Sequence, residues 1–403
     1  MTPGAPRAVP VADHGNDPAP AQRPLTVIQM LPALHSGGVE RGTLDLGRHL
    51  VRHGHRSIVI SAGGRLCEQL VADGSEHLCW DVGAKRPSSL LWVRRVRALL
   101  EARRPDILHL RSRLPAWIGY WAWRGIPAAE RPALITSVHG FYSVNRYSAI
   151  MTRGERVIAI SNSVHDYVLR HYPHVEPWRL RVIPRGVDPG HYPHGFRPPG
   201  EWLARWVQTY PQTRGRFIVT LPARLTRLKG HEDFIRITAA LKQRGIPVHG
   251  LVVGGTEARK RGYEAELRQW VQDAQLEGDI TFLGHRSDMR EIMSVSDAVL
   301  SLSNKPEAFG RTTLEALSMG RPAAGYDHGG VGEQLAAMCP EGRVPPGDWQ
   351  AMAELLARWR TQPPAVASDH PFTLAKMLAS TLDVYREALA GERTTAGGVR
   401  TGE

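Results

Sequence analysis

Short runs of apolar residues alternate with amphipathic stretches along most of the chain. Residues 25–31 form a continuous apolar run, which is typical of a strand buried on both faces of a parallel sheet. A glycine pair follows, and apolar residues then recur at helical spacing through residue 51. Comparable runs lie at residues 57–61, 80–82, 106–110, 133–138, 156–161, 180–184, 217–221, 248–253, 280–283, 298–302 and 323–326. Strands alternating with helices predict an α/β protein with doubly wound parallel sheets.

The pattern of strand, turn and helix begins anew near residue 217, and 403 residues fit two domains of ordinary size. Residues 189–199 are rich in Pro, Gly and His and predict a linker. We therefore predict an N-terminal Rossmann-like domain over residues 24–195 and a C-terminal one over residues 196–371. Residues 1–23 are predicted to be a disordered leader and residues 391–403 a disordered tail.

One stretch, residues 306–320, carries the strongest chemical signal. It places Glu307 in a loop, a turn at Gly310, and then a helix that Thr312 or Thr313 can cap and that carries Glu315 in its first turn. Free amides at a helix start bind phosphate, and the acids can accept hydrogen bonds from hydroxyls. The stretch predicts a ligand with phosphate in its middle and hydroxyls at both ends, which is the layout of a nucleotide-sugar.

Glu307 and Glu315 are separated by seven residues, and this stretch closely resembles the E-x7-E signature of the retaining glycosyltransferases of family 4, which adopt the GT-B fold. The resemblance implies that Glu307 contacts the donor sugar and Glu315 the nucleotide ribose. It extends over about residues 25–390 and implies that the last helix, residues 372–390, returns to the N-terminal domain. The alternative is that both acids are solvated residues flanking a helix.

Two motifs of the N-terminal half extend the resemblance. Gly37 and Gly38 match the family's GG-x-E loop, which implies a place beside the donor phosphates and acceptor; glycines also simply permit tight turns. His139 follows a predicted strand and matches the His-Gly position, which implies a hydrogen bond to the donor sugar near its sixth carbon. The family commonly has Asn where this chain has Arg185, and no contact is assigned to Arg185.

In the C-terminal half, Arg224 and Lys229 stand five residues apart after the first strand and can offer a fork and a point charge to a pyrophosphate. The resemblance implies the same role, and a solvated basic loop is the alternative. The predicted catalytic residues are His139, Arg224, Lys229 and Glu307. The predicted donor-binding residues are Gly37, Gly38, Gly254, Arg286, Phe309, Gly310, Arg311, Thr312, Thr313 and Glu315.

The net charge of +12 is uneven, because residues 1–195 carry +10 of it. A basic N-terminal half suits a phosphorylated glycolipid, a membrane surface or nucleic acid, although an arginine-biased composition would also explain it. Three scattered cysteines, no paired-cysteine motif and no D-x-D predict a reduced, cytoplasmic protein that needs neither metal nor cofactor. No apolar run reaches the length of a membrane span.

Trp117 and Trp121 lie four residues apart on one face of a predicted helix. They could anchor at a lipid interface, at the inner face of the cytoplasmic membrane, or pack in the core, and the position of the helix after a strand favours the core. We predict a metal-independent, retaining glycosyltransferase that uses a nucleotide-sugar and an anionic glycan or glycolipid, such as lipopolysaccharide core. A sugar-nucleotide epimerase and an Arg-rich nucleic-acid-binding protein are the alternatives.

Overall fold

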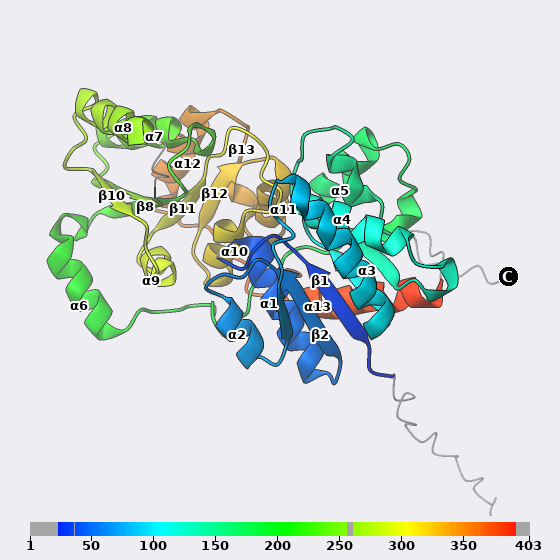
Figure 1. The fold of residues 1–403 in the computed structure, drawn as a ribbon. Coiled ribbons are helices and arrows are strands. Elements are labelled where there is room, and N and C mark those ends of the chain that lie inside the picture. Colours follow the sequence, from blue (N-terminus) through cyan, green and yellow to red (C-terminus); the bar gives the residue numbers. More distant parts are fainter. Residues whose placement is uncertain (1–22, 36, 256–260, 392–403) are drawn as a thin grey trace, which may run out of the picture.

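The computed structural model describes residues 23–35, 37–255 and 261–391. Most of the predicted leader and tail therefore lies outside the described residues. The N-terminal domain is built on a seven-stranded parallel sheet of order β3-β2-β1-β4-β5-β6-β7 (Figure 1). Its strands are β1 (Thr26–Met30), β2 (Arg56–Ser61), β3 (Glu76–Cys79), β4 (Ile107–Leu110), β5 (Ala133–Val138), β6 (Arg156–Ala159) and β7 (Leu180–Val182). Its helices are α1 (Gly38–Arg52), α2 (Cys67–Ala72), α3 (Leu91–Arg103), α4 (Arg113–Arg124) and α5 (Asn162–His171).

The C-terminal domain repeats this architecture with a six-stranded parallel sheet of order β10-β9-β8-β11-β12-β13. Its elements are α6 (Gly200–Thr209), β8 (Phe217–Pro222), α7 (His231–Gln243), β9 (Val248–Val253), α8 (Arg261–Asp273), β10 (Ile280–Gly284), α9 (Met289–Ser294), β11 (Ala298–Ser301), α10 (Arg311–Ser318), β12 (Ala323–Tyr326), α11 (Gly329–Met338), β13 (Arg343–Val344) and α12 (Trp349–Trp359). The prediction of two Rossmann-like parallel sheets is confirmed. The continuous apolar runs are buried on both faces, as in Val248–Val253.

The strand predicted at residues 80–82 is wrong. The strand lies earlier, at β3, where Ile58 of β2 pairs with Glu76 and Ser61 pairs with Cys79. Trp80 follows the strand, and its ring stacks on Trp92 of α3 with centroids 5.6 Å apart. The apolar run at residues 80–82 therefore reflects the packing of a loop tryptophan on α3, and not a strand.

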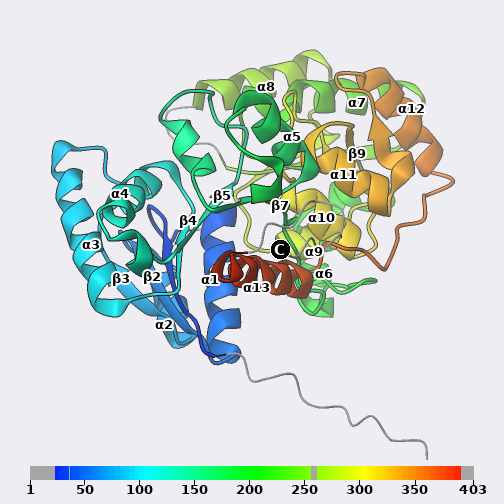
Figure 2. The ribbon, with the colours of Figure 1, turned by 90° about the vertical axis from the view of Figure 1, so that its right-hand side faces the viewer.

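The last helix, α13 (Leu374–Ala390), lies against the N-terminal domain (Figure 2). Leu378, Leu382 and Tyr385 of α13 are buried together with residues of β1, β4 and β5. The Tyr385 hydroxyl also lies 2.7 Å from Nδ1 of the buried His109 on β4. The polypeptide therefore begins and ends its described part on the same domain.

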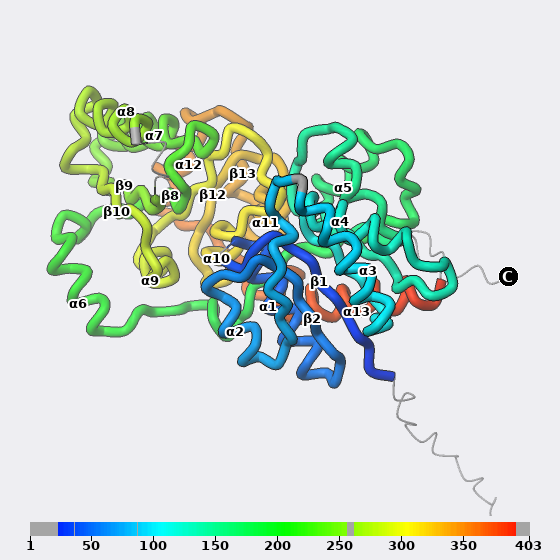
Figure 3. The backbone as a smooth tube through the Cα atoms, viewed as in Figure 1, coloured from blue at the N-terminus to red at the C-terminus, as the bar shows by residue number. Residues whose placement is uncertain are grey.

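The chain crosses between the domains twice, and the two crossings touch (Figure 3). The Val187 amide donates to the carbonyl of Phe372 at 3.1 Å, and the Leu374 amide donates to the carbonyl of Val187 at 2.7 Å. A Cβ on Gly186 would lie 2.3 Å from the carbonyl oxygen of Thr373, so glycine permits this close approach.

Two tryptophans of α4 have different surroundings. Trp117 packs against the core, and its indole N–H donates to the carbonyl of Tyr147 at 3.0 Å. Trp121 is 44% exposed, so the favoured prediction of core packing is wrong for it, because that side of α4 faces outward. Among the described residues no helix combines the length and apolar character that a membrane span requires.

Candidate active site between the two domains

A cavity of about 220 Å³ opens at the carboxyl ends of β8 and β11, where the loops of parallel strands meet. Its lining includes five residues that the sequence singled out: Arg224, Lys229, Glu307, Arg311 and Thr312. They come from two segments of the chain, the loop after β8 and the stretch from the loop after β11 into α10. The fold therefore places the basic loop after β8, the Glu307 loop after β11 and the start of α10 around one cavity.

Two of the lining residues, Lys229 and Glu307, form an ion pair. Nζ of Lys229 lies 2.6 Å from Oε1 of Glu307, and the Ser303 hydroxyl donates to the same oxygen. Both charged side chains remain about a quarter exposed, with 27% for Lys229 and 26% for Glu307. The pair is therefore accessible, and a phosphate entering the cavity can share the lysine.

Two glycines hold the cationic loop in place. Gly230 has φ +70°, and a Cβ there would lie 2.0 Å from the carbonyl oxygen of Leu302. A Cβ on Gly254 would lie 2.0 Å from the carbonyl oxygen of Ala223, next to Arg224. Gly254 therefore contributes by letting β9 approach the loop backbone, while Arg224 itself is exposed at the cavity rim.

Helix α10 begins differently from the prediction. Gly310, with φ +86°, is the N-cap, and no side chain caps the helix, so neither Thr312 nor Thr313 has the predicted capping role. Thr313 is buried, whereas Thr312 faces the cavity. Because Arg311 is the first helical residue, Glu315 lies in the second turn and not in the first. The left-handed glycine turns the chain into the helix and leaves the first backbone N–H groups without a side-chain acceptor.

Glu315 is 8% exposed, and its carboxylate accepts a hydrogen bond from Nη2 of Arg311 at 3.1 Å. Burial raises the pKa of Glu315, and the charges of Arg311 and Arg41 together with a hydrogen bond from Tyr192 oppose that rise. Arg311 also lines a second cavity, of about 320 Å³, together with Arg41, Arg48 and Tyr192. Glu315 thus belongs to the side of α10 that faces this second cavity.

Two predicted donor-binding side chains point elsewhere. The Phe309 ring is 5% exposed and packs edge-on against Phe372, with centroids 6.2 Å apart, so its place is in the core. The Arg286 guanidinium makes a two-pronged contact with Asp288, at 2.8 and 2.6 Å, and lies beside α6. A contact from the Arg286 position would therefore come from its main chain.

The glycine loop of the N-terminal domain lies over the start of α10. A Cβ on Gly38 would lie 3.4 Å from Cδ of Arg311. Gly37 is the N-cap of α1, and a Cβ there would lie 2.2 Å from a carboxylate oxygen of Glu40, which folds back over the turn. The predicted glycine loop and the predicted helix start are therefore in contact across the domain boundary.

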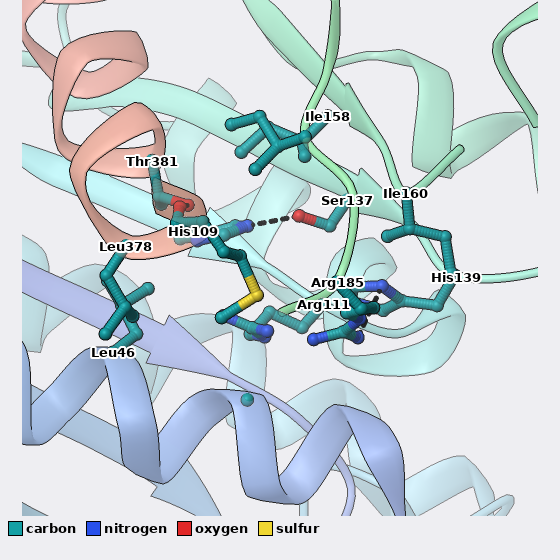
Figure 4. Close-up of a pocket in the computed structure, with 13 residues that line it drawn as sticks. Leu46, His109, Arg111, Ser137, His139, Ile158, Ile160, Arg185, Leu378 and Thr381 are labelled. Carbon is teal, nitrogen blue, oxygen red and sulfur yellow. Dashed lines mark hydrogen bonds between the residues drawn. The ribbon is translucent and has the colours of Figure 1, made fainter. Parts of the chain in front are cut away.

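His139 follows β5, and its ring faces the guanidinium of Arg185 in the same domain (Figure 4). Nη2 of Arg185 lies 3.0 Å from Nδ1 of His139, and since a guanidinium can only donate, Nδ1 accepts and the imidazole proton is on Nε2. Burial lowers the pKa of His139 well below its usual value, and the charges of Arg185 and Arg111 lower it further. His139 is therefore neutral at physiological pH.

Sequence reasoning did not identify Arg111, Arg185 or Ser303 as site residues. Arg111 lies directly after β4 and is 4% exposed, and Arg185 closes the N-terminal domain near Gly186. The signal for Arg185 was its departure from the Asn that the family commonly has. Ser303 had no signal, because a serine after a strand is unremarkable without its contact to Glu307.

Comparison with known proteins supports this assignment of the fold. Residues 36–191 match the model of Glycosyltransferase Family 4, and residues 205–369 match that of Glycosyl transferases group 1. The D-inositol 3-phosphate glycosyltransferase of Paenarthrobacter aurescens is 27% identical over 260 residues, which is 60% of each chain. The N-acetyl-alpha-D-glucosaminyl L-malate synthase of Bacillus anthracis is 24% identical over 76% of this chain and 80% of its own.

Solved structures agree. A glycosyltransferase from Rickettsia africae is 28% identical, covers 92% of this chain and 100% of its own, and has a TM-score of 0.77. Anabaena Alr3699/HepE in complex with UDP-glucose is 22% identical over 89% of this chain and 99% of its own, with a TM-score of 0.72, which shows the shared fold. With residues 36–191 and 205–369 both matched and the site built as described, the chain belongs to the GT-B glycosyltransferases.

Proposed function

We propose that this protein transfers a hexose-type sugar from a nucleotide-diphospho-sugar to a hydroxyl of an anionic cell-surface glycan or glycolipid, such as lipopolysaccharide core. The observation that carries this proposal is the cavity in which Arg224, Lys229 and Arg311 surround Glu307 beside the start of α10. Three cations and free helix amides suit a diphosphate, and the acid suits sugar hydroxyls.

In the proposed reaction, the bond between the sugar and the diphosphate breaks, and negative charge grows on the leaving diphosphate. Lys229 and Arg224 stabilise this charge, and removal of one such group typically costs 10²- to 10³-fold in rate. The acceptor oxygen forms the new bond on the same face of the sugar, and its proton passes to the leaving phosphate oxygen. The configuration at the sugar carbon is retained, and no metal takes part.

His139 has a defined part in this scheme. Because Arg185 donates to Nδ1, the ring presents Nε2–H as a donor, and Nε2 is buried without a partner in the described part of the chain. A donor N–H fits a hydroxyl or carbonyl oxygen of the transferred sugar. His139 therefore positions the sugar as a neutral donor and does not take the acceptor proton.

An anionic acceptor is supported by two independent observations. The N-terminal half carries most of the net positive charge. The names of two relatives specify compounds that bear acid groups, namely inositol 3-phosphate and L-malate. A glycolipid acceptor would also bring this domain to a membrane surface at the cytoplasmic face. Leu90, Leu91 and Trp121, which are 58%, 68% and 44% exposed, provide apolar contacts among the arginines of α3 for such a peripheral contact.

The test begins with a thermal-shift panel of UDP-, GDP- and ADP-sugars, because binding to the native state raises Tm. We expect one donor to raise Tm and to be consumed only when an acceptor is present, with chelator making no difference. Formation of an epimeric nucleotide-sugar from donor alone would favour the epimerase. If no nucleotide-sugar binds and duplex or single-stranded DNA does at physiological salt, glycosyl transfer is excluded.

A further inference from the structure

The N-terminal domain contains a pair of arginines whose charges have no carboxylate counterpart at contact distance. Arg111 follows β4 and Arg185 follows β7, and both line a small cavity with His139 (Figure 4). No carboxylate of the described residues lies within 4.0 Å of either guanidinium. Arg111 is buried and Arg185 is partly buried. Buried charges are normally paired, so two guanidinium groups side by side without a carboxylate require an explanation.

The two guanidinium groups converge on Gly42 of α1. A Cβ on Gly42 would lie 2.3 Å from Nη1 of Arg185 and 3.3 Å from Nη2 of Arg111. Only a residue without a side chain leaves room for both groups here. The two positively charged groups therefore pack directly against the backbone of α1 at Gly42.

The charged form of both arginines is destabilised in this arrangement, and the pKa of each is lowered. Burial lowers the pKa of Arg185 to about 9, and the charges of Arg111 and Arg311 contribute. Burial likewise lowers the pKa of Arg111 to about 10. Asp45 partly offsets the charge of both at longer range. A negatively charged group between them would remove this penalty.

The groups left without partners are all donors. Nε of Arg111 and Nε2 of His139 are buried and have no hydrogen-bond partner among the described residues. Arg111 uses Nη1 on the Gln29 side chain at 2.9 Å, and Arg185 uses Nη2 on His139. Since His139 carries its proton on Nε2, the cluster offers several N–H groups and no acceptor. Its chemical complement is an oxyanion.

We propose that Arg111 and Arg185 bind a carboxylate or phosphate group of a substrate, with His139 as a third donor. The cavity between them has a volume of about 20 Å³, which suits a single oxyanion oxygen. This inference rests on the proposed function, and it assigns an acid group to one of the two substrates. That group belongs either to the transferred sugar, as in a uronic acid, or to the acceptor.

The experiment measures Kd by calorimetry for two matched pairs of probes. UDP-glucuronate against UDP-glucose tests the donor, and inositol 3-phosphate against inositol, in the presence of UDP, tests the acceptor. We expect one anionic probe to bind at least tenfold more tightly than its neutral partner. Arg185→Gln and Arg111→Gln should each weaken binding of that probe about 10- to 100-fold and weaken binding of the neutral partner less, so that the preference for the anionic probe falls.

Arg94→Gln, at an exposed position of α3, is the matched control and should change neither Kd. Arg185→Lys keeps the charge without the fork and should recover part of the preference, and wild-type-like Tm shows that each variant is folded. The inference is overturned if UDP or UDP-glucose binds but neither anionic probe is preferred, or if the preference survives Arg185→Gln. Failure of every nucleotide to bind would instead refute the proposed function.

Discussion

The Glu333 carboxylate of α11 accepts hydrogen bonds from the backbone N–H of Asn162 at 2.9 Å and of Ser163 at 2.7 Å. These residues form the first turn of α5 in the opposite domain. The side chains of Asn162 and Ser163 donate to the same carboxylate at 3.0 and 2.7 Å. A carboxylate at a helix start interacts with the free amides and with the helix dipole. The contact therefore ties the two domains together across the cleft.

We predict that Glu333→Gln loosens this contact, because the amide keeps the shape but loses the charge. The expected cost is about 1 kcal/mol, since the site is partly exposed. It would be seen as a Tm lower by a few degrees and a larger radius of gyration in small-angle scattering. Glu341→Gln, an exposed acid of the same domain, is the control. Unchanged scattering and Tm in Glu333→Gln would contradict a role in holding the cleft closed.

Replacing Lys229 should affect the reaction far more than the fold. Lys229→Met removes the charge that lies 2.6 Å from Glu307, and we expect kcat/KM to fall about 10²- to 10³-fold. Lys376→Met, at an exposed position of α13, should leave kcat/KM unchanged. Steady-state kinetics with the donor found in the thermal-shift panel provides the measurement. A loss of less than threefold would remove Lys229 from the proposed charge stabilisation.

Gly42→Ala should displace the Arg185 guanidinium while leaving the helix intact. The added methyl would lie 2.3 Å from Nη1, at the mobile end of the arginine side chain, and alanine favours helix by about 1 kcal/mol over glycine. We expect little change in Tm and a weaker preference for the anionic probe. Gly278→Ala, where nothing lies within 4 Å, is the control. A preference equal to that of the wild type in Gly42→Ala would mean that the position of Arg185 is immaterial.

His109 makes stability depend on pH. Its ring lies 2.7 Å from both the Tyr385 and the Ser137 hydroxyls, and burial lowers its pKa well below 6.5. In the unfolded chain His109 is protonated as the pH falls through about 6.5, whereas in the folded chain it stays neutral there. Stability therefore falls as the pH drops below 6.5. Between pH 7.5 and 5.5 this group alone should cost about 1.4 kcal/mol.

Urea unfolding of the wild type and His109→Gln at both pH values measures this difference. We expect the variant to be less stable at pH 7.5 because it lacks the ring contacts, yet to lose less stability than the wild type on acidification. Equal losses in the two proteins would show that other buried histidines account for the pH dependence.

Much of the architecture could be predicted from hydrophobic periodicity, because strands buried on both faces are continuous apolar runs. Residues 248–253 illustrate this, since all six are buried. The same signal failed at Trp80, whose apolar ring packs on a helix after the strand has ended. Periodicity reports burial, and it does not distinguish a strand from an aromatic contact in a loop.

The site was predictable where its residues follow strands in sequence, as Arg224, Lys229 and Glu307 do. Their proximity follows from the topology, because parallel strands deliver their loops to one edge. The Phe309 ring and the Arg286 side chain were placed by motif position alone, and their orientation depends on Phe372 and Asp288, partners that the motif does not contain. Arg111 follows β4 and Arg185 follows β7, and β5 and β6 separate these two strands in the sheet. Their meeting therefore depends on the path of the chain after β7 and on the bare backbone at Gly42, which the sequence pattern does not reveal.

The paired crossings at Val187 and Thr373 give the molecule its mechanical character. Two strands of chain that are hydrogen-bonded to each other resist stretching and sliding, but each can twist, so the simplest relative motion of the domains is a swing about this pivot. When the two domains swing apart, Gly38 and Arg311, which are in contact across the domain boundary, move away from each other. Because Gly186 has no side chain that would push the two crossings apart, their hydrogen bonds can persist while the facing surfaces of the two domains separate.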